Sequence, residues 1–125
     1  MILSIIVPTY NEEKTIIKIL EKIKNNSSDF FKYEVIVIDD ASTDQSSKLL
    51  EDNKHLYDKL LINETNKGKG FSVKRGISSA SGTHVIFQDA DLEYNPGDFK
   101  KFEKIFIDFD ADGIIGSRFV YSNYT

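Results

Sequence analysis

The sequence predicts an α/β fold in which a mostly parallel sheet carries helices on both faces. Short apolar runs rich in β-branched residues alternate with segments in which apolar residues recur at helical spacing. The runs at 2–7 and 34–38 are almost continuously apolar, which is typical of strands that are buried on both faces. The connections are short, so we expect parallel strands joined by right-handed crossovers.

Length and composition describe one ordinary globular domain over residues 1–125. Hydrophobic residues make up 40% of the chain and charged residues 29%, and no apolar run is long enough to span a membrane. The apolar start at 1–7 is too short for the core of a signal peptide. The absence of cysteine excludes disulfides and thiol chemistry, and a net charge of −4 provides no general attraction for nucleic acid. These features favour a cytoplasmic protein.

The predicted elements alternate along the whole chain. The first strand, at 2–7, is expected to end at Pro8, and Asn11 is the expected N-cap of the helix that follows. The apolar residues of that helix are Ile16, Ile17, Leu20 and Ile23. Further strands are expected at 34–38, 59–62, 83–88 and 113–116, and further helices at 45–53, 71–80 and 96–109.

Four clusters of polar residues each follow the carboxyl end of an expected strand. The clusters lie at 8–12, 39–44, 66–70 and 89–93. In open parallel sheets, ligands bind at the edge formed by the carboxyl ends of the strands. We therefore expect the four clusters to converge on one crevice.

Asp89 and Asp91 form the clearest candidate metal site. Side chains alternate along an extended segment, so these two carboxylates can project together from the end of the fourth strand. Two hard oxygen ligands suit Mg²⁺ or Mn²⁺, which take their remaining ligands from water and from a substrate's phosphates. The small Ala90 between them leaves room for a bulky ligand. A solvated acidic loop is the alternative, and the position directly after a strand favours the metal site.

Asp39 and Asp40 follow the second strand and could read a nucleotide, because carboxylates accept hydrogen bonds from a base or a ribose. The alternative is helix capping, which Ser42, Thr43 or Asp44 could provide for the next helix. The two interpretations are compatible, with Ser42 or Asp44 structural while Asp39 and Asp40 face a ligand.

The run Lys67-Gly68-Lys69-Gly70 places two cations and two flexible residues just before an expected helix. This arrangement suits contact with a diphosphate or a nucleobase, which makes Lys69 a candidate binding residue. The run lacks the spacing of a P-loop and that of a dinucleotide-binding fold, so it favours neither an ATPase nor a dehydrogenase. An exposed basic loop is an equal interpretation for Lys67.

Arg118 follows Gly116 and Ser117 beyond the last expected strand, where an arginine could hold a phosphate bidentately. A surface arginine is the alternative. His55 and His84 have no partner at metal-binding or catalytic-triad spacing, so neither is assigned a catalytic role.

The order of these motifs strongly resembles the N-terminal part of the family 2 glycosyltransferases, which are inverting enzymes of the GT-A fold that use nucleotide sugars. The matching runs are Ile6-Val7-Pro8-Thr9-Tyr10-Asn11-Glu12, Val37-Ile38-Asp39-Asp40-Ala41-Ser42-Thr43-Asp44 and Asn66-Lys67-Gly68-Lys69-Gly70. Gln88-Asp89-Ala90-Asp91-Leu92-Glu93-Tyr94 and Gly116-Ser117-Arg118-Phe119 are most similar to the polyprenyl-phosphate sugar transferases, the branch of the dolichyl-phosphate mannose or glucose synthases.

The resemblance implies a Rossmann-like nucleotide-diphospho-sugar transferase domain with a defined donor site. Pro8, Tyr10 and Glu12 would contact the nucleoside, Ile38 and Asp40 would line the base site with Asp39 nearby, Asp89, Ala90 and Asp91 would hold a metal diphosphate, and Arg118 would meet the donor phosphates. The expected activity is metal-dependent transfer of a sugar from a UDP- or GDP-sugar to an acceptor such as a polyprenyl phosphate or a glycan.

Related enzymes continue past the position of Arg118 with an acceptor-binding half that this chain does not contain. We therefore expect a truncated domain, and a catalytic base, where one exists, in the missing half. Relatives often carry membrane-associating helices, so the expected location is the cytoplasm, at the cytoplasmic face of a membrane. A non-catalytic nucleotide-sugar-binding module, a nucleotidyltransferase and a purely structural fragment are the alternatives, and the oligomeric state stays open.

Overall fold

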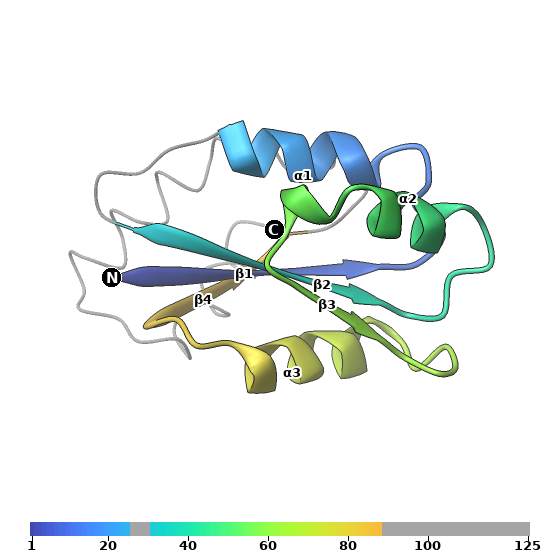
Figure 1. Cartoon of the computed structure of the whole chain (residues 1–125). Coiled ribbons are helices and arrows are strands. Elements are labelled where there is room, and N and C mark those ends of the chain that lie inside the picture. The colour runs from blue at the N-terminus through green and yellow to red at the C-terminus, as the bar shows by residue number, and fades with distance from the viewer. Residues whose placement is uncertain (26–30, 89–125) are drawn as a thin grey trace, which may run out of the picture.

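In the computed structural model, the described residues form a central parallel sheet of four strands (Figure 1). The structure describes residues 1–25 and 31–88. The elements follow one another as β1 (Ile2–Thr9), α1 (Ile16–Asn25), β2 (Lys32–Asp39), α2 (Ser46–Asp52), the 3-10 helix η1 (Lys54–Leu56), β3 (Lys59–Ile62), α3 (Lys69–Ser79) and β4 (His84–Phe87). The strand order in the sheet is β3-β2-β1-β4.

The register of the strands brings their carboxyl ends to one edge. β1 pairs with β2 as far as Thr9↔Asp39, and β2 pairs with β3 as far as Asp39↔Ile62. β1 also pairs with β4, as far as Ile6↔Phe87. The loops that follow β1, β2 and β3 therefore begin side by side.

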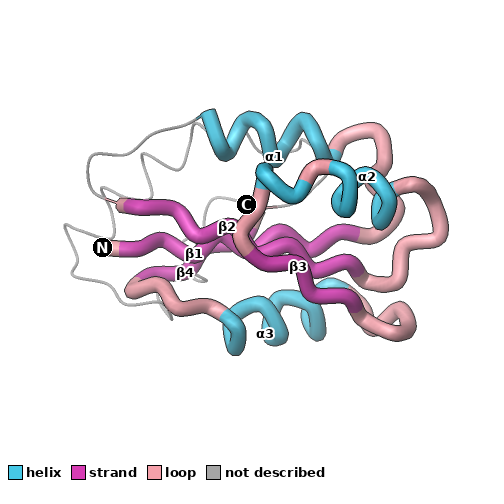
Figure 2. Tube along the Cα trace, viewed as in Figure 1, coloured by secondary structure: helices cyan, strands magenta, loops and turns pink. Residues whose placement is uncertain are grey.

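The helices cover both faces of the sheet, with α1 and α2 on one face and α3 on the other (Figures 1 and 2). Alternation along β1 explains this division, because Leu3, Ile5 and Val7 pack in one apolar cluster and Ile6 packs in another. The first cluster includes the buried residues of α1, which are Ile16, Ile19, Leu20 and Ile23. This architecture confirms the predicted α/β fold.

The prediction that the first strand ends at Pro8 is wrong, because β1 continues to Thr9. The Ile6 carbonyl accepts a hydrogen bond from the Gln88 N–H on the β4 side, and the Thr9 carbonyl accepts from the Asp40 N–H on the β2 side. Alternate residues of a parallel strand bond to opposite neighbours, so Pro8 shares the β4 side with Ile6. The N–H that proline lacks is therefore not needed for the ladder with β2.

Two helices begin at residues other than those predicted. α1 begins at Ile16, and Asn11 is not its N-cap. Instead, the Glu12 carbonyl accepts hydrogen bonds from the N–H groups of Thr15 (3.1 Å) and Ile16 (2.9 Å). α3 begins at Lys69 rather than two residues later, so Lys69 belongs to the first turn of the helix and not to the preceding loop.

The other described strands and α-helices agree with their predicted bounds to within two residues, which is the normal spread of helix and strand ends, whereas η1 was not predicted. The predicted helix at 96–109 and the predicted strand at 113–116 lie outside the described residues. In the described part of the chain, no helix has the length and apolar character that a membrane crossing requires.

A carboxylate network holds the opposite, amino-terminal edge of the sheet. Glu34 of β2 accepts hydrogen bonds from the Ser4 hydroxyl (2.7 Å) and from the backbone N–H (2.9 Å) and hydroxyl (2.5 Å) of Ser81. Lys59 of β3 forms an ion pair with Glu34 at 3.6 Å. Burial alone would raise the pKa of Glu34, but the hydrogen bonds from Ser81 and Ser4 and the charge of Lys59 outweigh it and lower the pKa to about 2. Glu34 therefore stays ionised at neutral pH.

α3 lies very close to the sheet at Gly76, which is buried. A Cβ added at this glycine would lie 2.6 Å from Cγ2 of Ile6 and 2.8 Å from Cδ1 of Ile38. Both distances are well inside van der Waals contact, so the helix can approach the sheet this closely only where a side chain is absent.

We expect Gly76→Ala to lower the free energy of unfolding by about 1–3 kcal/mol, because the added methyl group overpacks the contact with β1 and β2. Gly70→Ala in the same helix is the matched control, since a Cβ there meets nothing within 4 Å. That substitution should leave stability unchanged or raise it by up to about 1 kcal/mol. Urea denaturation measures both effects, and equal effects of the two substitutions would contradict the close packing.

Candidate functional site

Three loops lie together at the carboxyl edge of the sheet, one after each of β1, β2 and β3 (Figure 1). They span residues 10–15, 40–45 and 63–68. Hydrogen bonds join the first loop to the second and the second to the third. The structure thus brings three of the four predicted polar clusters together, and the fourth, at 89–93, lies outside the described residues.

Asn11 ties the β1–α1 loop to the β2–α2 loop. Its backbone is in the left-handed region at φ 51°, a conformation that asparagine adopts more readily than most residues. Its side-chain oxygen accepts hydrogen bonds from the backbone N–H groups of Thr43 (2.7 Å) and Asp44 (3.2 Å). The Glu12 N–H donates to the Ser46 hydroxyl at 2.9 Å, which adds a second connection. The first two loops therefore form one hydrogen-bonded unit.

Asp44 has the structural role that the sequence suggested for this segment. Its carboxylate accepts from the backbone N–H of Ser46, the first residue of α2, at 2.8 Å, and from the N–H of Glu13 at 3.2 Å. Burial raises the pKa of Asp44, but hydrogen bonds from Ser46 and Glu13 outweigh this effect, so the pKa lies below its ordinary value.

The two adjacent carboxylates at the end of β2 point to opposite faces of the sheet. Asp39 accepts hydrogen bonds from the Ser42 N–H at 3.0 Å and from the Ser47 hydroxyl, on the side of α2. Asp40 accepts its hydrogen bonds from the β3–α3 loop on the other side. This separation follows from the alternation of side chains along an extended backbone. Each carboxylate therefore holds a different loop.

Asp40 is 4% exposed, and both of its oxygens accept hydrogen bonds. Oδ1 accepts from the Lys67 N–H (2.7 Å) and from the Asn63 amide (2.8 Å), and Oδ2 accepts from the Gly68 N–H (2.9 Å). Burial raises the pKa of Asp40, but these hydrogen bonds outweigh it and lower the pKa below its ordinary value. An ionised Asp40 thus holds the backbone of the loop that leads into α3.

Asn63 extends this network into α3 and was not a predicted site residue. Its amide nitrogen donates to Asp40 and to the Ser72 hydroxyl (3.0 Å), and its oxygen accepts from Nη1 of Arg75 (2.9 Å). The same Arg75 nitrogen donates to the Ile62 carbonyl at 2.8 Å. The signal in the sequence is a polar residue directly after the apolar strand at 59–62, a position that also fits an ordinary loop residue.

The predicted nucleoside-contacting residues differ widely in exposure. Tyr10 is 45% exposed, whereas Glu12 is partly buried and accepts a hydrogen bond from the Thr15 hydroxyl at 3.3 Å. Pro8 is buried, and Ile38 is fully buried in the apolar cluster under α3. Tyr10 is therefore the predicted residue most open to a ligand, while Pro8 and Ile38 support the edge from beneath.

Lys69 lies toward the end of β4. Its ammonium nitrogen is 5.3 Å from the centre of the Phe87 ring, a cation–π geometry. Phe87 is the last residue of β4 and precedes Asp89 by two positions. Asp89, Ala90, Asp91 and Arg118 lie outside the described residues. Within the described ranges no group of three or more His, Asp or Glu residues is placed to hold a metal ion.

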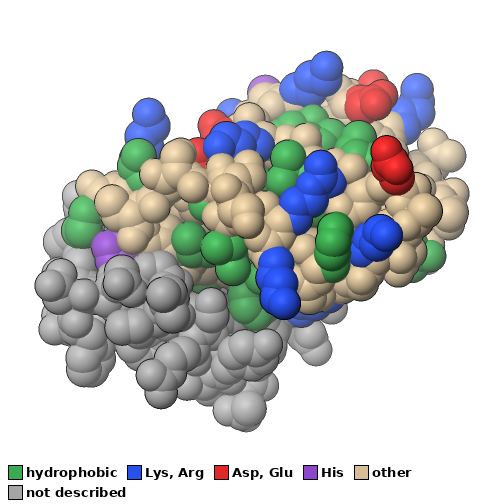
Figure 3. Space-filling model, turned by 90° about the horizontal axis from the view of Figure 1, so that it is seen from below, with side chains coloured by type: hydrophobic (Ala, Val, Ile, Leu, Met, Phe, Trp, Pro, Cys, Tyr) green, Lys and Arg blue, Asp and Glu red, His purple; other side chains and the backbone are tan. Residues whose placement is uncertain are grey.

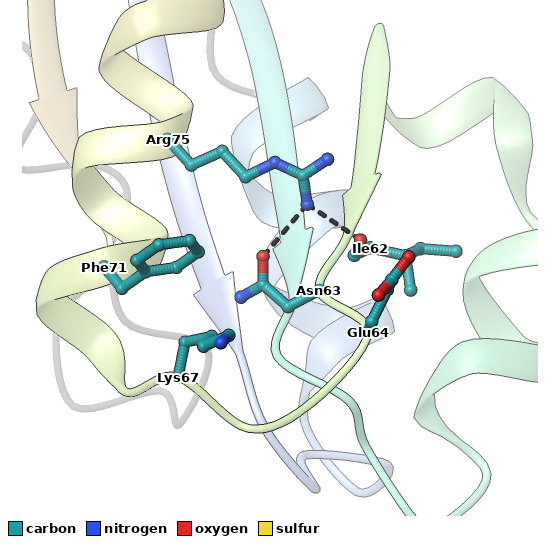
Figure 4. A pocket seen from close by; sticks show the side chains of 6 residues that line it. All are labelled: Ile62, Asn63, Glu64, Lys67, Phe71 and Arg75. Atoms are coloured by element: carbon teal, nitrogen blue, oxygen red, sulfur yellow. Dashed lines mark hydrogen bonds between the residues drawn. The ribbon is translucent and has the colours of Figure 1, made fainter.

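A separate pocket of about 280 Å³ opens between β3 and α3 (Figure 4). It is lined by Ile62, Asn63, Glu64, Lys67, Phe71 and Arg75. The Lys67 ammonium nitrogen lies 5.9 Å from the centre of the Phe71 ring. Asn63, Glu64 and Lys67 belong to the loop at 63–68, so the pocket adjoins the candidate site, but it contains no residue of the loops at 10–15 or 40–45.

We expect Asp40→Asn to lower the free energy of unfolding at pH 7 by about 2–4 kcal/mol, because an amide has only one acceptor oxygen for these N–H groups. The pKa of Asp40 is lowered from 3.8, so this difference from wild type is fully present above that pH and shrinks as the pH falls through the lower folded pKa. Urea denaturation at several pH values measures it.

Hydrogen exchange at the amides of Lys67 and Gly68 provides a local readout for the same substitution. We expect these amides to exchange faster in Asp40→Asn, whereas Asp52→Asn, at an exposed position on α2, should change neither stability nor exchange. Unchanged exchange at Lys67 and Gly68 in the Asp40 variant would show that Asp40 does not hold the loop.

Known proteins resemble this chain in both sequence and fold. The family model described as Glycosyl transferase family 2 matches residues 4–125. A dolichyl-phosphate beta-glucosyltransferase of Mus musculus is 39% identical over 113 residues, which cover 82% of this chain and 35% of the relative. The structure of S. aureus TarS 1–349 in complex with UDP matches with a TM-score of 0.72 and 31% identity, over 86% of this chain and 32% of that one.

A second solved structure, the mannosyltransferase PcManGT from Pyrobaculum calidifontis in complex with GDP-Man and Mn²⁺, matches with a TM-score of 0.67 and 31% identity. The match covers 77% of this chain and 29% of that one. The chain thus spans about a third of the length of each of these three proteins. The structural matches confirm the predicted GT-A architecture, and the family model covers almost the whole sequence. The chain belongs to glycosyl transferase family 2.

Proposed function

We propose that this chain is the donor-binding part of a glycosyltransferase that moves a sugar from a UDP- or GDP-sugar to an acceptor with the help of Mg²⁺ or Mn²⁺. One observation carries the proposal. Three loops are hydrogen-bonded together at the carboxyl edge of the sheet, and Lys69 lies beside Phe87 at the end of β4. The Asp89-Ala90-Asp91 run begins two residues after Phe87. Ligands of open parallel sheets bind at this edge.

The nucleoside is proposed to lie over the ends of β1 and β2. Tyr10 follows β1 directly, and its exposed ring offers a surface on which a base can stack. Glu12 lies in the β1–α1 loop at this edge, with its backbone N–H bonded to Ser46 at the start of α2, and it is proposed to accept a hydrogen bond from a ribose hydroxyl. Pro8 and Ile38 would form the apolar floor beneath the nucleoside.

Asp40 is proposed to hold the β3–α3 loop and also to accept a hydrogen bond from a nucleobase. Its Oδ2 accepts one described hydrogen bond, from Gly68, and an ionised carboxylate oxygen has room for two acceptor contacts. A base imino or amino group would supply the additional donor. Asp39, whose oxygens are held by Ser42 and Ser47, would lie nearby and position the β2–α2 loop.

Asp89 and Asp91 are the residues proposed to hold the metal with the donor diphosphate. Two carboxylates separated by the small Ala90 are a donor set that suits a hard divalent cation. When bound, the cation would stabilise the negative charge that develops on the departing diphosphate. Lys69 and Arg118 are proposed to add positive charge beside the phosphates.

The proposed acceptor is a polyprenyl phosphate, with a glycan as the alternative. The mouse relative is named for a dolichyl-phosphate acceptor, and the chain spans 35% of that relative. A phosphate monoester has a second pKa of about 6, so a lipid phosphate is largely ionised at neutral pH and needs little help from a protein base. We also propose that the enzyme acts at the cytoplasmic face of a membrane, where a lipid acceptor would lie.

Calorimetric titration with UDP, GDP and their sugar conjugates tests the donor site without requiring an acceptor. The solved structures contain UDP in one case and GDP-Man with Mn²⁺ in the other, so both bases belong in the panel. We expect micromolar binding of one nucleotide in the presence of Mn²⁺ and binding weaker by roughly tenfold or more in chelator, because the metal bridges protein and diphosphate.

Asp91→Ala should weaken binding in Mn²⁺ as much as the chelator does. Asp52→Ala removes an exposed carboxylate on α2 and is the matched control, for which we expect unchanged binding. A folded sample that binds none of the nucleotides, or an Asp91→Ala variant that binds as well as wild type, would overturn the proposal.

A further inference from the structure

The α3 side of the molecule differs in charge from the rest of the chain. Residues 59–80, which contain β3, the β3–α3 loop and α3, include five basic residues and one acidic residue, although the whole chain has a net charge of −4. Residues 10–25 and 41–58, which contain α1, α2 and the loops beside them, include six basic and seven acidic residues. Two further carboxylates face the α3 side, because Asp40 bonds to the β3–α3 loop and Glu34 to Lys59 and Ser81. Positive charge is therefore concentrated on one side of the sheet.

Basic and apolar side chains share the outer stripe of α3. Phe71, Lys74 and Ile77 of α3 recur three residues apart and are exposed. Lys67 of the preceding loop is also exposed and lies over the Phe71 ring, and we call these four residues the α3 patch. Phe71 is 48% exposed and Ile77 40%, and Ile62 of the neighbouring β3 is 50% exposed. Figure 3 shows lysine and arginine side chains spread over this face with hydrophobic side chains between them.

In the described ranges, Lys67 and Lys74 form no ion pair with a carboxylate. Glu34 pairs with Lys59 instead, at 3.6 Å, near the start of β3. Arg75, beside the patch, donates to two neutral acceptors, the Ile62 carbonyl and the Asn63 amide oxygen. Glu64 is the one carboxylate within residues 59–80. The face therefore presents a positive field next to exposed apolar side chains.

We propose that the α3 patch docks this domain on an anionic lipid surface. Lipid phosphates would attract Lys67 and Lys74, while Phe71 and Ile77 would enter the boundary between headgroups and acyl chains. A nucleic acid would satisfy the cations, but its phosphate backbone offers no apolar environment for an exposed isoleucine. Phe71, Lys74 and Ile77 lie on the outside of a helix, a convex surface that suits an extended lipid surface better than an inserted peptide.

The pocket between β3 and α3 adds a recess to this face (Figure 4). Lys67, Phe71 and Arg75 line the recess, so one lipid phosphate could enter beside two cations while its acyl chains remain outside. The α3 patch contains none of the residues assigned to the nucleotide sugar. A substitution at Phe71 or Lys74 is therefore expected to weaken vesicle binding without weakening nucleotide binding.

Sedimentation of the purified chain with vesicles tests the proposal. Vesicles of phosphatidylcholine are compared with vesicles that also contain phosphatidylglycerol, and we expect binding to the anionic vesicles to be stronger by about tenfold at low salt. Lys74→Glu should weaken this binding by about tenfold. Phe71→Ser should weaken it severalfold at low and high salt alike, because it removes apolar insertion and not charge.

Lys48→Glu is the matched control, because it makes the same charge change at an exposed position on α2, on the opposite layer. We expect it to change vesicle binding by less than about twofold, and circular dichroism verifies that each variant is folded. Equal losses for Lys48→Glu and Lys74→Glu would show that net charge, and not the α3 patch, governs binding. The proposal would also be overturned if folded wild type bound no vesicles or bound both kinds of vesicle equally. It would likewise be overturned if the chain bound DNA through Lys74 and did not bind vesicles.

Discussion

Side chains alternate along β2, and at its end this alternation directs two neighbouring carboxylates into different loops. Asp39 holds the loop that leads into α2, and Asp40 holds the loop that leads into α3. Asn11 then joins the β1–α1 loop to the first of these two. All three loops of the candidate site therefore depend on the position of one strand end, which is buried and paired on both sides. Binding groups placed on such an edge need little ordering when a ligand arrives.

Much of the fold could be predicted because hydrophobic periodicity reports burial. The apolar runs that became β1 and β2 are buried almost throughout, and the helical spacing of Ile16, Leu20 and Ile23 corresponds to the buried side of α1. The end of β1 could not be predicted, because whether a proline interrupts a strand depends on which neighbour its missing N–H would face. That neighbour is set by the register and not by the local sequence.

The candidate site was predictable in its location but not in its internal bonds. Polar residues after apolar strands indicated that a site lies at the carboxyl edge. Because the carboxyl ends of parallel strands meet at one edge, these polar residues were expected to lie close together. The partners of Asn11 lie 32 and 33 residues away, and Asn63 binds both Asp40 and α3, so local spacing could not reveal either role. The proposed lipid-facing patch begins at Lys67, whose backbone Asp40 holds, so the donor edge and the α3 face share one loop.

The most direct test of the account is to map nucleotide binding onto the backbone by NMR. With assigned amide resonances and Mg²⁺ present, titration with UDP and GDP should produce the largest shift changes in the loops at 10–15, 40–45 and 63–68 and at Lys69. The amino-terminal edge around Ser4, Glu34 and Ser81 should change little, since it lies at the opposite end of the strands. Shift changes centred on that edge or on the outer surface of α1 would contradict a donor site at the carboxyl ends of the strands.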